Sequence, residues 1–138
     1  MVDNSKLFEK YKLNNNKEVP NRLVIAPMCI SGADEERSYL AHRAKDVGLY
    51  ILGASVVSEE GIGMFKQTSA ISDKDLPSLA ERAKIVQDQG ALAISQIVHC
   101  GLSGSKKFWG KTPLSPSANV SNEYLEKNGR LNDDNRNE

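Results

Sequence analysis

Three short segments carry the residue types best suited to binding a ligand or reacting with one. They are Pro27-Met28-Cys29, Gly53-Ala54-Ser55 and Gln96. A cysteine offers a thiol for hydrogen bonding or nucleophilic attack, and a glutamine offers a donor and an acceptor that suit the edge of a heterocycle. Small residues let another group approach the backbone closely. These segments are therefore the candidate functional sites.

Each segment also has a simpler structural explanation. A free cysteine is often a small buried hydrophobe, and a buried glutamine bonds a neighbouring strand, since an unpaired amide costs about 1–3 kcal/mol. The small residues at 53–55 would suit tight packing of a helix on a sheet. His99 is a candidate base for Cys29, and His99, Cys100 and Cys29 form a candidate metal-ligand set. Residue types alone leave these alternatives open.

Apolar runs and helical spacing predict the elements that position these residues. Strands are expected over 22–26, 49–58 and 91–99, helices over 35–46 and 75–89, and a turn over 14–21. Asp34 and Asp73 are the expected helix starts, and Gly48 and Gly90 are the expected helix stops.

Strands that alternate with helices in this way predict an α/β fold with a parallel sheet and right-handed crossovers. The run 49–58 has the composition of a strand buried on both faces. In parallel α/β folds, ligands gather at the carboxyl ends of the strands. Cys29, Ala54 and Gln96 all lie at or near such ends.

Composition and charge argue against several classes of protein. The chain of 138 residues has 18 basic and 18 acidic residues, so neither nucleic acid nor a membrane surface is an expected partner. Its apolar runs are shorter than the ~20 residues of a membrane span, and residues 1–13 are too polar for a signal peptide. A cytoplasmic location is expected, in which two distant cysteines are poor evidence for a disulfide.

Four collinear segments between about Leu7 and Ser117 carry a family resemblance. They are "VPNRLVIAPM", "SYLAHRAKDVGLYILG", "VVSEEGIGMFKQTSAISD" and "QIVHCGLS". Together they resemble the Old Yellow Enzyme family of FMN-dependent NAD(P)H oxidoreductases. The resemblance implies a partial TIM (β/α)8 barrel, with about the first three βα units, an N-terminal turn or hairpin and a polar C-terminal tail.

The resemblance also implies roles for individual residues. Pro27, Met28 and Cys29 would lie against FMN, with Cys29 as a residue that tunes the redox potential of the flavin. Ala54 would approach the ring near its reactive nitrogen, and Gln96 would pair with its pyrimidine edge. NAD(P)H would be the reductant, and an enone-like small molecule would be the acceptor. No catalytic residue is expected within this chain.

A complete barrel needs roughly 200 residues or more. The family's His-His or His-Asn pair that binds the substrate, its proton-donor tyrosine and its phosphate-binding loops would therefore lie beyond Glu138. The chain also has Ser31, Gly53 and Leu102 where an aromatic residue, an acidic residue and an arginine are usual in the family or its cysteine-containing subgroup. Residues 7–120 are expected to be the N-terminal part of an FMN-binding domain, and residues 121–138 a polar, poorly ordered tail.

Three hypotheses follow. The first is that the chain is the N-terminal portion of an FMN-dependent oxidoreductase and is inactive alone. The second is a non-enzymatic chain that associates with other chains, including copies of itself, because an open parallel sheet has an unpaired edge. The third is an unrelated small α/β enzyme that uses Cys29 or a metal.

Overall fold

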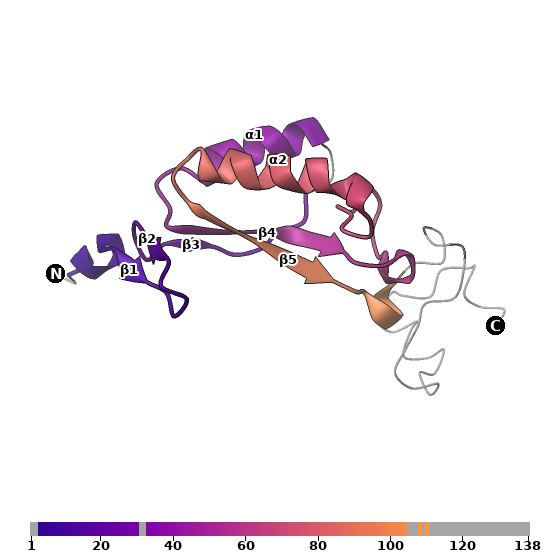
Figure 1. Cartoon of the computed structure of the whole chain (residues 1–138), viewed down its shortest axis with the longest axis horizontal. Helices are drawn as coiled ribbons and strands as arrows, with labels where there is room; N and C mark the ends of the chain where they lie inside the picture. Colours follow the sequence, from indigo (N-terminus) through magenta and orange to yellow (C-terminus); the bar gives the residue numbers. More distant parts are fainter. Residues whose placement is uncertain (1–2, 31–32, 105–107, 109, 111–138) are drawn as a thin grey trace.

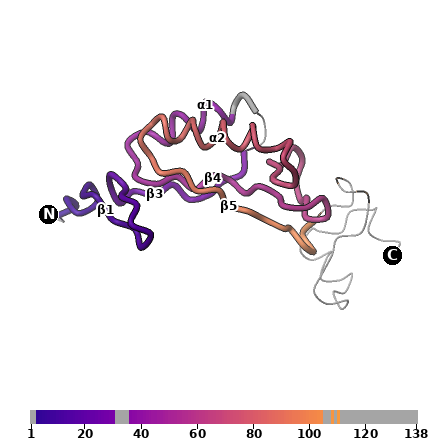
Figure 2. Tube along the Cα trace, in the orientation of Figure 1, coloured from indigo at the N-terminus to yellow at the C-terminus, as the bar shows by residue number. Residues whose placement is uncertain are grey.

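The computed structural model describes residues 3–30, 33–104, 108 and 110. Within them, β3 (Val24–Ile25), β4 (Leu49–Val56) and β5 (Leu92–Val98) form a parallel sheet in that order. The helices α1 (Ala33–Arg43) and α2 (Leu76–Gln87) connect the strands and lie side by side over one face (Figure 1 and Figure 2). The predicted alternation of strands and helices is confirmed.

A short antiparallel hairpin precedes the sheet. It pairs β1 (Tyr11–Lys12) with β2 (Glu18–Val19), after a 3-10 turn at Ser5–Phe8 that the sequence did not predict. Asn16 has a φ of 65° in the connecting turn, a left-handed conformation that asparagine tolerates well. The expected turn and hairpin are therefore confirmed.

The hydrophobic core lies between the sheet and its two helices. The fully packed cluster consists of Leu40, Ala44, Tyr50, Leu52, Val86 and Ala91. The strand β4 is buried along almost its whole length, because β3 and β5 flank it and the helices cover it. The prediction that this strand is buried on both faces is confirmed.

The sheet face opposite the helices is open at β3 and β5 in the described part of the chain. Val24 is 54% exposed and Ile94 is 41% exposed. Ile94 pairs with Ile51, which is out of phase with the helix-facing Tyr50. Among the described residues the strand β5 pairs only with β4, so it forms an edge of the sheet there. The described residues thus form an open sheet rather than a closed barrel.

Gly48 was expected to end the first helix, and that prediction is wrong. The helix α1 ends at Arg43, and Asp46 takes the left-handed conformation with a φ of 61°. Gly48 instead packs against the chain before β3, since a Cβ added there would lie 2.1 Å from the Asn21 carbonyl oxygen. Asn21 also receives the amide of Leu23 and donates to the Asp46 carbonyl, both at 3.0 Å.

The predicted helix starts also need correction. Asp34 lies inside α1, and Asp75 rather than Asp73 organises the entry to α2. One carboxylate oxygen of Asp75 accepts the Ser69 hydroxyl at 2.8 Å and the Ser72 amide at 2.9 Å. The backbone bond from Ser72 and the hydroxyl bond from Ser69 lower the pKa of Asp75.

The second helix ends as the sequence predicts. Gly90 has a φ of +86° just after α2, a conformation that suits glycine at a helix end. Residues 121–138, the expected polar tail, lie outside the described residues. In the ranges that are described, no helix has the length and apolar character needed to cross a membrane.

Replacing Gly48 by alanine tests the close contact with Asn21. We expect Gly48→Ala to lower the free energy of unfolding by about 3 kcal/mol, because a backbone segment must shift. Gly90→Ala is the control: nothing lies within 4 Å of its added Cβ, so only the left-handed backbone is strained, at a cost of about 1 kcal/mol. Urea unfolding followed by circular dichroism measures both values, and equal losses would contradict the contact.

The lowered pKa of Asp75 predicts acid sensitivity with a definite sign. Its contribution to stability is fully present above the ordinary value of 3.8 and is lost as the pH falls from there through the lower folded-state pKa. Asp75→Asn should remove this pH-dependent part, so the stability difference from the unaltered chain shrinks below that pH. Asp73→Asn is the matched control and should keep the acid-dependent loss. Thermal unfolding across a pH series makes the comparison.

Candidate functional site

The segment that follows β3 touches β4 directly at Gly53. A Cβ added at Gly53 would lie 2.2 Å from the Met28 carbonyl oxygen and 3.1 Å from the Cys29 Cα. The small residue therefore admits the chain's own backbone from the segment after β3. This differs from both explanations drawn from the sequence, which were a packed helix and a bound ligand.

A bulge in β4 brings this contact next to Gln96. Leu52 pairs with Ser95, whereas Ser55 pairs with Ile97, so β4 has one more residue than β5 between the two pairs. Gly53 and Ala54 of β4 consequently lie opposite the single residue Gln96. The three segments picked out from the sequence are thus neighbours at one edge of the sheet.

The alternative in which Gln96 is a buried amide bonded to a neighbouring strand is wrong for the described residues. It is exposed, in a strand whose central residues 94–97 are all exposed. The physical reason is its position: β5 is at the edge of the sheet, and Gln96 is in phase with Ile94 on the uncovered face. Its amide is therefore accessible to a ligand.

The segment after β3 is also accessible. Cys29 is exposed, Met28 is 59% exposed, and Pro27 is half-buried. The Tyr39 hydroxyl of α1 donates to the Met28 sulfur at 3.7 Å. The alternative of Cys29 as a small buried hydrophobe is wrong, since Cys29 is exposed in the described structure.

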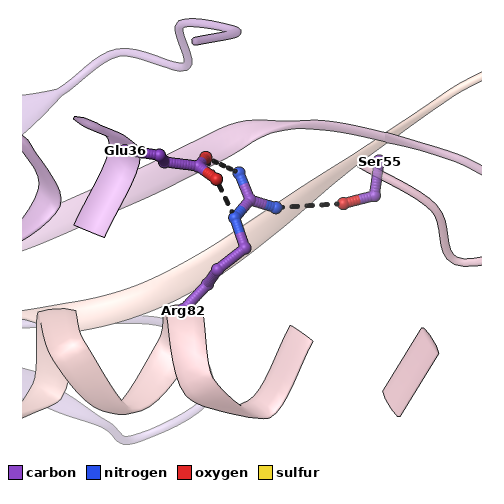
Figure 3. Close-up of polar contacts among 3 residues, drawn as sticks. All are labelled: Glu36, Ser55 and Arg82. Atoms are coloured by element: carbon purple, nitrogen blue, oxygen red, sulfur yellow. Dashed lines mark hydrogen bonds and ion pairs between the residues drawn. The ribbon is translucent and has the colours of Figure 1, made fainter. Parts of the chain in front are cut away.

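A buried ion pair lies behind this edge of the sheet. Arg82 of α2 donates to one carboxylate oxygen of Glu36 of α1 through Nε at 3.1 Å and Nη2 at 2.6 Å. The Nη1 atom of Arg82 makes a third contact, because it donates to the Ser55 hydroxyl at 3.4 Å (Figure 3). Ser55 is fully buried and Arg82 is 6% exposed.

Sequence reasoning passed over Arg82, although a signal was present. Arg82 stands three residues after Leu79 and four before Val86, on the apolar face of an amphipathic helix. A charged residue at such a position needs a buried partner.

Residues of the loop after β4 complete the surroundings. A cavity of about 10 Å³ lies between Cys29, Ala54, Arg82 and this loop, and an open hollow of about 370 Å³ extends from it toward Asp75. Lys66 and Gln67 line both spaces. Neither was identified as a site residue from the sequence, although both lie in one of the four segments that carry the family resemblance.

The metal-site alternative is contradicted for the described residues. No group of three or more histidine, cysteine, aspartate or glutamate side chains there could hold a metal ion. Nor does a hydrogen bond join Cys29 to His99 in that part of the chain. The His99 Nδ1 atom instead accepts the Gly101 amide at 3.0 Å. His99 is therefore not arranged as a base for Cys29.

Parallel βα units with candidate binding residues at the carboxyl edge are the arrangement found in βα-barrel enzymes. The sequence model of the NADH:flavin oxidoreductase / NADH oxidase family matches residues 6–132, and the chain belongs to this family. The resemblance to Old Yellow Enzymes is confirmed, and so is the partial TIM barrel.

Curated relatives agree with this assignment. The chain is 30% identical over 103 residues to the probable NADH-dependent flavin oxidoreductase YqiG of Bacillus subtilis, covering 70% of this chain and 28% of the relative. It is 29% identical over 126 residues to the NADH:fumarate oxidoreductase of Klebsiella pneumoniae, covering 86% of this chain and 14% of the relative. The chain therefore spans less than a third of either protein.

Solved structures give the same fold. The old yellow enzyme homologue from Zymomonas mobilis superposes with a TM-score of 0.72 at 25% identity, over 82% of this chain and 33% of that protein. Morphinone reductase in complex with tetrahydroNAD superposes with a TM-score of 0.73 at 24% identity, over 84% and 34% respectively. These matches correspond to about the first third of each barrel protein.

Proposed function

We propose that residues 7–120 are the N-terminal part of an FMN-dependent NAD(P)H oxidoreductase domain. The observation that carries this proposal is the row formed by Met28–Cys29, Gly53–Ala54 and Gln96 at the carboxyl edge of three adjacent strands. Family membership supplies the flavin and the nicotinamide reductant. Bound FMN would supply hydride transfer, which the side chains present here cannot perform themselves.

The residues in this row fit the edge of a flavin ring. The exposed Gln96 amide offers a donor and an acceptor to the pyrimidine edge. The exposed Cys29 thiol offers a weak hydrogen bond close to the ring, and Ala54 leaves room for the ring to approach the backbone. Pro27 and Met28 would lie against the ring. These residues bind, orient and tune the cofactor rather than transfer protons.

The proposed acceptor is a small molecule with an activated alkene, such as an enone. The name of the Klebsiella relative supports this class, because fumarate is an alkene activated by two carboxylates. The names of the Bacillus and Klebsiella relatives both include NADH, which supports NADH as one reductant.

The second candidate function, association with other chains, is favoured by the open sheet. Ile94 and Val24 are exposed on the uncovered face, and in the part of the chain that the structure describes β5 has an unpaired edge. Sedimentation of the purified chain distinguishes the two. A stable oligomer without flavin binding would favour association with other chains. A monomer that binds flavin would favour the first proposal, in which the chain is part of a flavin-binding domain.

The isolated chain should bind the flavin ring weakly. We expect FMN and riboflavin to bind with comparable low affinity, because the family resemblance assigns the phosphate site to later strands. Nuclear magnetic resonance should detect shifts at Cys29, Ala54 and Gln96. Gln96→Ala should weaken binding, whereas Gln89→Ala, which removes an exposed glutamine after α2, should not. Tight one-to-one FMN binding would contradict the expectation.

Cys29 should tune the flavin rather than attack a substrate. In a chimera that joins residues 1–104 to the later strands of the Bacillus relative, Cys29→Ala should shift the flavin midpoint potential while turnover continues. Cys29→Ser, which keeps a hydrogen-bonding group, should shift it less. Complete loss of turnover in both variants, with flavin still bound, would indicate a nucleophile instead.

A further inference from the structure

We infer that Arg82 is a positioning residue which, with Glu36, anchors the bulged end of β4 in the register that the candidate site needs. The cofactor part of this inference rests on the proposed function. The anchoring itself rests on the contacts of Arg82, Glu36 and Ser55. Nothing in it requires Arg82 to touch the flavin or the reacting atoms.

The first step of the argument is the burial of the ion pair. The side chains of Arg82 and Glu36 are 7% and 13% exposed, and they join α2 to α1. A buried guanidinium persists only where its charge is matched and its donors are used. Glu36 balances the charge of Arg82 and accepts hydrogen bonds from its Nε and Nη2 atoms. The Nη1 atom of Arg82 remains to donate to Ser55 of β4.

The second step is the direction of Ser55. Tyr50 and Leu52 belong to the helix-facing core, so regular alternation would place residue 54, not residue 55, on that face. Ser55 reaches Arg82 because β4 has one extra residue between Leu52 and Ser55.

A strand without the bulge would turn the Ser55 hydroxyl away and leave a buried N–H of Arg82 without that acceptor. Such an unpaired donor is unfavourable. The ion pair therefore favours the bulged register over the regular one.

The third step connects the anchor to the site. Ala54 immediately precedes Ser55, and Arg82 lines the same small cavity as Ala54 and Cys29. Fixing Ser55 therefore keeps Ala54 opposite Gln96 and keeps Gly53 against the backbone of the segment after β3. The ion pair therefore affects the row formed by Met28–Cys29, Gly53–Ala54 and Gln96 indirectly, by fixing the conformation of β4.

Two variants and one matched control test the anchor in the full chain. Ser55→Ala removes only the hydroxyl. The double variant Glu36→Gln/Arg82→Met removes both charges together, so neither is left buried and unpaired. Arg37→Gln is the control, since Arg37 and Glu81 form an ion pair of 2.8 Å between the same two helices with side chains about half exposed.

Amide hydrogen exchange is the first readout. Beyond the bulge, the Val56 amide donates to Thr68 and the Val57 amide donates to Val98. Both should exchange about tenfold faster or more in Ser55→Ala and in the double variant. The Leu49 and Leu92 amides, at the other end of the sheet, should be unchanged.

Arg37→Gln should leave all four exchange rates unchanged. A uniform acceleration, or none, in Ser55→Ala would overturn the inference, and this variant decides the matter even where the double variant fails to fold.

Riboflavin is the probe for the second readout. Shifts that it causes at the Ala54 amide and the Gln96 side-chain amide should diminish in Ser55→Ala and persist in Arg37→Gln. Shifts of full size in Ser55→Ala would overturn the positioning role. If riboflavin causes no shifts at these residues in the unaltered chain, the proposed function fails, whereas the exchange rates still decide the anchor.

Discussion

The extra residue in β4 is the constraint on which the rest of the site depends. Before it, Tyr50 and Leu52 face the helices, and after it Ser55 does. The central strand thus contributes to the core on one side of the bulge, and at the bulge itself it presents Gly53 and Ala54 beside Gln96. In this register β4 pairs with β5 and Ser55 also reaches Arg82 of α2, whereas a register without the extra residue would turn Ser55 away from that helix.

Most of the fold could be predicted from the sequence, because the apolar runs and helical spacing are strong local signals. The errors fell at element ends. Gly48 follows the first helix closely enough to look like a stop, but its small size serves a contact with Asn21, which is distant in the sequence. Asp73 and Asp75 both suit a helix start, and only the Ser69 and Ser72 contacts of Asp75 distinguish them.

The site was predicted less completely. The positions of Cys29, Ala54 and Gln96 at neighbouring strand ends follow from parallel topology, which the sequence does reveal. The exposure of Gln96 could not be read from its apolar neighbours, because it depends on which strands lie beside β5. Arg82 required knowledge of where α1 places Glu36, a contact between residues 46 positions apart.

The location of the core has a consequence for the order of events during synthesis. A ribosome that has released Val98 has already released every member of the helix–sheet cluster and the whole of β5. Packing of this layer therefore requires no later part of the polypeptide, and the edge of β5 would be formed before the next strand of a longer relative emerges. In such relatives the first third of the barrel would serve as a template on which vectorial assembly continues.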